Sequence, residues 1–128
     1  EGAMAAKAAE RRTPETIAEL TAQMAKLQKL IPHPAAYVHE DIAFHDILMR
    51  MSGDKLSKAV IDGVQAEALR NHGYSGKLNV EHVRETHASH EAIYAAIVDG
   101  DGERACRAMR DHIESSWARR RAARKPRS

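Results

Sequence analysis

The stretch Asp41-Ile-Ala-Phe-His45 decides how this sequence is interpreted. It lies within residues 35–51, a strongly helical segment. Because positions three and four apart share one face of a helix, Asp41 and His45 are expected to point the same way. The apolar residues expected on that face are Val38, Ile42, Leu48 and Met49. A carboxylate and an imidazole therefore interrupt a face that should be wholly apolar.

Two later helical segments repeat this pattern. His90 falls in a stripe with Val83, Ile93 and Ile97. His112 falls in a stripe with Ala105, Ala108, Met109 and Ser116. A single histidine on an apolar face is most often a core residue that is hydrogen-bonded to a carbonyl. Three such helices can converge in one bundle, however, and one metal ion would satisfy all four polar groups, which are otherwise costly to bury.

The proposed ligands limit the choice of metal. Imidazole and carboxylate together suit zinc, nickel, manganese or iron, and zinc is the favoured ion. A thiolate zinc site is excluded because Cys106 is the single cysteine. Three histidines and one carboxylate would fill a tetrahedral shell or leave positions open in an octahedral one. An open position would let a small anion, such as a carboxylate, bind the ion directly.

Composition predicts one all-α domain. The chain has 128 residues, of which 43% are hydrophobic and 4% aromatic, and few stretches alternate with a period of two. Short linkers between the helices predict an antiparallel helical bundle of about six helices. The predicted helices span residues 3–12, 14–30, 35–51, 55–71, 78–98 and 103–119. With one cysteine, no signal peptide and no apolar run of about 18 residues, we expect a cytoplasmic protein without a membrane partner.

Charge divides the chain into two parts. The predicted folded domain covers residues 1–118, and residues 119–128 are expected to form a basic, disordered tail. This tail holds six of the positive charges, so a net charge of +2 leaves −4 on the body. An acidic body is a poor surface for nucleic acid.

Enzyme signatures are mostly absent. The run His90-Glu-Ala-Ile-Tyr94 begins like a metalloprotease helix, but Tyr94 stands where the second histidine belongs. The chain has no Glu-x-x-His pair, no glycine-rich phosphate loop and no nucleophile elbow. We therefore expect no enzymatic activity. Two alternatives stay open: a small helical-bundle metalloenzyme acting on an organic acid, with His87 as its base, and a structural module whose core histidines bind no metal.

Three stretches resemble a known family. The run Asp41–Leu48 matches a D-x-x-F-H-x-x-L motif. The run His90–Asp101 matches E-H-x-x-I-x-x-A-I-x-x-G-D from its histidine onward, but Ser89 stands where this motif has glutamate. Ala105, Met109 and His112 match A-x-x-x-M-x-x-H. Together these stretches resemble the FCD domain, the FadR C-terminal ligand-binding domain of GntR-family bacterial transcription regulators. The resemblance spans nearly the whole chain.

The resemblance implies a metal-binding, effector-sensing domain. In such a domain, a divalent ion on Asp41, His45, His90 and His112 would help to bind a small organic acid. The domain would pair as a homodimer and modulate DNA binding by a winged-helix domain, which this chain lacks; its first helix is expected to be truncated. Candidate effector contacts are Arg84, His87, Arg70 and Asn71, because an arginine fork matches a carboxylate. His87 lies one turn before His90 and could also donate a hydrogen bond to a metal ligand or be an alternate ligand, but we expect it to be partly exposed. His33, His39, His72 and His82 are expected to be solvated.

Overall fold

The computed structural model describes residues 2–53, 59 and 79–124. Within these residues the secondary structure is entirely helical, as predicted, and no strand occurs among them. The helices are α1 (Gly2–Glu10), α2 (Pro14–Leu30), α3 (Pro34–Ser52), α5 (Val80–Val98) and α6 (Gly102–Arg124). The helix predicted for residues 55–71 lies outside the described residues, apart from residue 59.

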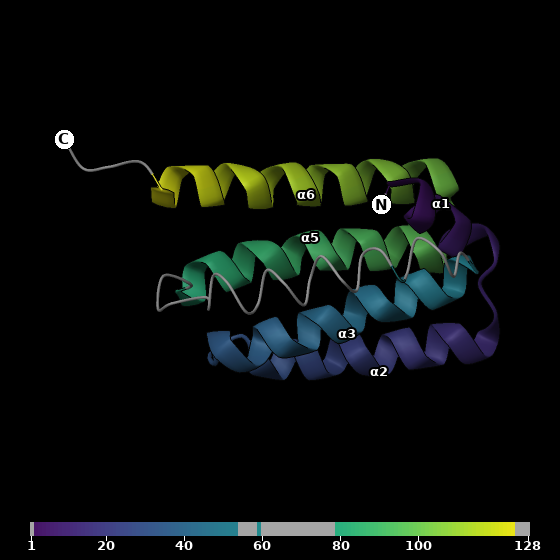
Figure 1. Cartoon of the computed structure of the whole chain (residues 1–128). Coiled ribbons are helices and arrows are strands. Elements are labelled where there is room, and N and C mark those ends of the chain that lie inside the picture. The colour runs from purple at the N-terminus through teal and green to yellow at the C-terminus, as the bar shows by residue number, and fades with distance from the viewer. Residues whose placement is uncertain (1, 54–58, 60–78, 125–128) are drawn as a thin grey trace.

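The long helices lie side by side in a bundle (Figure 1). Helix α2 is antiparallel to α3, and α5 is antiparallel to α6, as the short connections between them require (Figure 1). Helix α1 lies at one end and packs against α6, α3 and α5. None of the described helices has the length and apolar character needed to cross a membrane.

Local signals fix most of the helix ends. Thr13 caps α2: its hydroxyl accepts a hydrogen bond from the Thr16 backbone N–H, the Thr16 hydroxyl accepts one from the Thr13 backbone N–H, and Pro14 begins the helix. Gly53 ends α3 in the left-handed region, with φ of 75°. Asn79 caps α5 by accepting a hydrogen bond from the His82 backbone N–H, so that helix begins two residues later than predicted.

Helix α6 is longer than predicted. It was expected to end near residue 119, where the basic tail was placed, but it continues to Arg124. Residues 119–124 are thus helical and not disordered. Alanine and arginine are both strong helix formers, and their intrinsic preference outweighs the repulsion between neighbouring positive charges.

An aliphatic core brings the helices together. Four helices contribute side chains that are wholly buried: Leu20, Leu48, Ile93, Ile97 and Met109. Burying a side chain of this size contributes about 1.5–3 kcal/mol to stability. Helix α1 adds the small side chains Ala5, Ala8 and Ala9, also fully buried, which allow it to approach closely. As a result of this packing, α3, α5 and α6 each direct one face toward the interior of the bundle.

Candidate metal centre

Three buried histidines from three helices meet inside the bundle. His45 of α3, His90 of α5 and His112 of α6 each offer a ring nitrogen, and these atoms all lie within 4.8 Å of one another. Two ligands on one zinc ion are separated by about 3–4 Å, because each zinc–nitrogen bond is about 2.0–2.1 Å long. The 4.8 Å limit on the distances between these nitrogen atoms is therefore close to the separation expected when they bind one shared ion.

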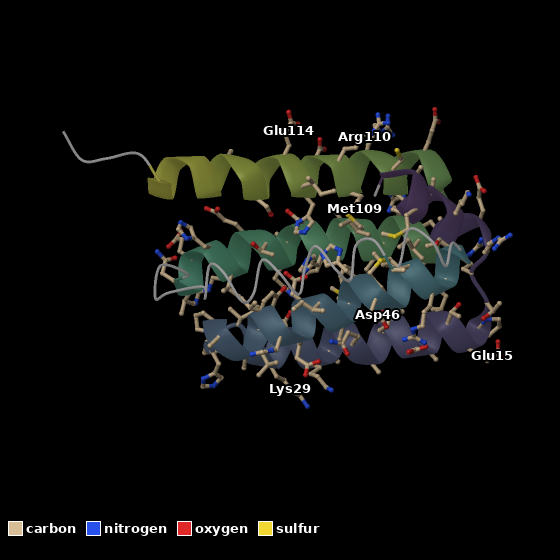
Figure 2. The ribbon with its side chains drawn as sticks, in the orientation of Figure 1. Glu15, Lys29, Asp46, Met109, Arg110 and Glu114 are labelled. Atoms are coloured by element: carbon tan, nitrogen blue, oxygen red, sulfur yellow. The ribbon has the colours of Figure 1, made fainter. Side chains whose placement is uncertain are left out.

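The direction of the α6 face explains the position of His112. Figure 2 shows Met109 on the side of α6 that faces α5, and Arg110 and Glu114 on the opposite side. Met109 is fully buried, whereas Arg110 and Glu114 are exposed. His112 lies three residues after Met109 and so shares its inward face, with an exposed fraction of 5%.

Asp41 lies beside two of these histidines. Its Oδ1 atom is 3.0 Å from His90 Nε2 and 3.2 Å from His45 Nε2. Asp41 Oδ1 and His90 Nε2 are both buried, yet neither atom forms a hydrogen bond. A buried polar atom left in this state costs about 1–3 kcal/mol. Coordination to a cation is one way to remove this cost, so the donor set fits a divalent metal.

Electrostatics favour the ionised carboxylate of Asp41. Burial raises the pKa of Asp41, but the close contacts with His90 and His45, which attract the carboxylate when protonated, outweigh burial and hold this pKa well below its usual range. Asp41 is thus held as a carboxylate, the form that can coordinate a cation.

The buried face of α3 is rotated slightly from the predicted one. Val38 and Ile42, which were expected to lie on the inward stripe, are half-buried. Tyr37 and Phe44 are instead almost completely buried, at 2% and 0% exposure. Phe44 packs against His90, with ring centroids 4.6 Å apart. Asp41 and His45 are one helical turn apart and therefore share a face of α3. Despite the rotation, this face still lies toward the buried side.

His87 is more buried than predicted. It was expected to be partly exposed, but its exposed fraction is 3%. Its Nδ1 atom lies 2.9 Å from Tyr37 Oη, and its Nε2 atom lies 2.9 Å from Gln28 Oε1. These partners come from α2 and α3, so no local sequence signal on α5 could have revealed them.

Tyr37 is the residue of the site that the sequence reasoning missed. Its hydroxyl lies 2.9 Å from His90 Nδ1 as well as from His87 Nδ1. The available signal was spacing: Tyr37, Asp41 and His45 succeed one another at four-residue intervals on one face of α3.

Two of the predicted effector contacts, His87 and Arg84, are among the described residues. Arg84 is exposed on α5, between the buried residues Val83 and His87. Arg70 and Asn71 lie outside the described residues. Of the histidines expected to be solvated, His33 and His39 are exposed and His82 is half-buried, whereas His72 is not among the described residues.

Comparison with known proteins decides the family. The sequence model of the FCD domain matches residues 1–115, which is most of the chain. The chain belongs to the FCD domain family. The resemblance found in the sequence motifs is thereby confirmed, together with the helical bundle that it implied.

A solved structure has the same fold. The chain is similar to E. coli McbR/YncC, a GntR-family regulator, with a TM-score of 0.79 and 19% sequence identity. The match covers 90% of this chain and 56% of that one, so this chain spans little more than half the length of its structural relative. A comparison with curated proteins gave no match.

Proposed function

We propose that this chain is the effector-sensing domain of a GntR-type transcription regulator, and that it binds a small organic acid at a divalent metal ion. The proposed ligands are Asp41, His45, His90 and His112, with zinc as the favoured ion and nickel, manganese or iron as alternatives. The observation that carries the proposal is the group of three buried histidines, two of which lie 3.0 and 3.2 Å from the carboxylate oxygen Asp41 Oδ1.

Metal chemistry explains how such a site would recognise an acid. When bound, the ion would supply a concentrated positive charge with coordination positions left for an anionic oxygen. Asp41 contributes one negative charge, which only partly balances a divalent ion, so a carboxylate ligand would be attracted to the remainder. The surrounding side chains, including Phe44 and Met109, are fully buried and apolar, which strengthens this attraction by excluding water.

Regulation would follow from a difference in affinity. An acid that binds one arrangement of paired domains more tightly than another shifts the population toward that arrangement. We propose a homodimer as the paired state, with DNA bound through a separate winged-helix domain and the cytoplasm as the site of action. Arg84 stays a candidate effector contact, because its guanidinium is accessible on α5.

The proposal is tested by metal content and acid binding together. Purified protein should contain stoichiometric divalent metal, and a thermal-shift screen of small organic acids should give hits that disappear with a chelator. The variant His90→Ala should lose both metal and acid binding. The matched control His39→Ala removes an exposed histidine from α3 and should keep both.

Two outcomes would contradict the proposal. If the His90→Ala and His112→Ala variants keep the wild-type metal content, the metal site is wrong. If the metal-loaded protein turns over an organic acid, the metalloenzyme alternative replaces the sensor. Saturable binding without turnover supports the sensor.

A further inference from the structure

A chain of hydrogen-bonding groups leads from His90 to the protein surface. Tyr37 Oη lies 2.9 Å from both His90 Nδ1 and His87 Nδ1. Beyond it, His87 Nε2 lies 2.9 Å from Gln28 Oε1 and 3.2 Å from Glu91 Oε1. Tyr37 and His87 are buried, whereas the Glu91 side chain is 60% exposed. The chain thus links helices α2, α3 and α5 and ends in solvent.

The contacts of His87 with Glu91 and Gln28, at the outer end of the chain of contacts, determine which atoms donate and which accept. A carboxylate can only accept, so the contact with Glu91 places a hydrogen on His87 Nε2, and Gln28 Oε1 accepts from the same atom. Burial lowers the pKa of His87, which favours the neutral ring. A neutral ring with its hydrogen on Nε2 has a lone pair on Nδ1. Tyr37 must therefore donate its hydroxyl hydrogen to His87.

The inner end follows from the first donation. Burial and the charges of Asp41 and Glu91 raise the pKa of Tyr37, so the phenol keeps its proton. That single hydrogen is directed at His87, which leaves the Tyr37 oxygen to accept from His90. His90 Nδ1 must then carry a hydrogen.

The consequence lies at the far side of the His90 ring. When the His90 ring is neutral, a hydrogen on Nδ1 leaves a lone pair at Nε2, the atom 3.0 Å from Asp41 Oδ1. The opposite tautomer would place a hydrogen on Nε2, where it could be donated to Asp41.

We propose that Tyr37 and His87 are positioning residues that hold His90 in the tautomer able to coordinate a metal through Nε2. Gln28 and Glu91 anchor the outer end of the chain. Histidine ligands are generally oriented by a partner on the other ring nitrogen, and losing that partner typically weakens metal binding about 10- to 100-fold. The inference rests on the metal site of the proposed function, and it assigns to His87 a role other than effector contact.

The first test compares zinc affinity in matched tyrosine variants. Tyr37→Phe removes the hydroxyl and keeps the ring, so zinc binding, measured by competition with a chromophoric chelator, should weaken about 10- to 100-fold. Tyr94→Phe is the control, because the Tyr94 hydroxyl on α5 bonds to Thr21 Oγ1 at 2.5 Å, away from this chain of contacts. Equal zinc affinity of Tyr37→Phe and wild type would overturn the inference and leave the proposed metal site standing. A wild-type chain that binds no zinc would overturn the proposed function itself.

The second test reads the tautomer without metal. NMR of the imidazole nitrogens in the metal-free protein should show His90 protonated at Nδ1 and His87 at Nε2. The variant His87→Asn keeps an acceptor near the position of Nδ1 and should retain the His90 tautomer, whereas His87→Leu should lose it along with zinc affinity. Protonation of wild-type His90 at Nε2 would contradict the inference, as would an unchanged tautomer in His87→Leu. A structural role alone would not make Asn succeed where Leu fails.

Discussion

Asp41 Oδ1 and His90 Nε2 lie 3.0 Å apart in the bundle interior, and no hydrogen bond joins them. The two residues are 49 positions apart in sequence and belong to different helices, α3 and α5. A divalent ion that binds both atoms would hold them together. We therefore predict that the metal-bound protein is more stable than the metal-free one, and this difference can be measured.

Zinc should raise the stability of the fold. A ligand that binds only the native state at about 100 times its Kd adds about 2.7 kcal/mol, which corresponds to several degrees in Tm. Differential scanning calorimetry of chelator-treated protein, before and after zinc is added, measures this shift. Calcium serves as the control ion because it prefers oxygen ligands to imidazoles. Identical transitions with zinc and with chelator would contradict the account.

Asp41→Asn should weaken zinc binding while leaving the fold intact. The substitution keeps the size of the side chain and removes its charge, so we expect a loss of at least about tenfold in zinc affinity. Isothermal titration of zinc into the metal-free protein measures it. Asp46→Asn is the matched control on α3, since Asp46 pairs with Arg50 at 3.1 Å. If both variants bind zinc equally well, Asp41 is not a ligand.

Ile93→Ala should destabilise the bundle. Ile93 is fully buried on the same face of α5 as His90, and truncating such a side chain typically costs about 2–5 kcal/mol. Urea unfolding followed by circular dichroism gives the free energy of unfolding. Val98→Ala, at the exposed end of α5, should change it by no more than about 0.5 kcal/mol. Comparable losses in the two variants would show that the core is assigned wrongly.

Thr13→Ala should remove the cap of α2. The Thr13 hydroxyl accepts from the Thr16 backbone N–H at 3.1 Å, and loss of such a cap costs about 1 kcal/mol. Thr13→Ser keeps an acceptor at that place and should recover most of the loss. Both values come from the same urea titrations. An equal loss in Thr13→Ser would contradict a capping role.

The sequence predicted which side of each helix is buried better than which residue lies at the middle of that side. Helical spacing was enough to place His45, His90 and His112 on inward stripes, and the structure brings them together. It was not enough to choose between Val38 and Tyr37, which are neighbours on the helix and differ by about 100° in direction. Packing against α5 decides that choice, because Tyr37 finds His87 and His90 there.

Properties that depend on tertiary partners were predicted least well. His87 was expected to be partly exposed because its partners Gln28 and Tyr37 are more than 45 positions away in sequence. The end of α6 was placed too early because the run of arginines was interpreted as a solvated, frayed tail, although arginine is a strong helix former. In both cases a local pattern was outweighed by a competing physical effect.

Anomalous X-ray scattering from crystals of the zinc-loaded chain tests the central claim most directly. The account predicts one strong peak inside the bundle, at about 2.0–2.2 Å from an atom of each of Asp41, His45, His90 and His112. Loss of that peak in crystals of His90→Ala would confirm that this histidine holds the ion. A zinc-loaded crystal with no peak among these four side chains, or with its peak elsewhere, would contradict the account.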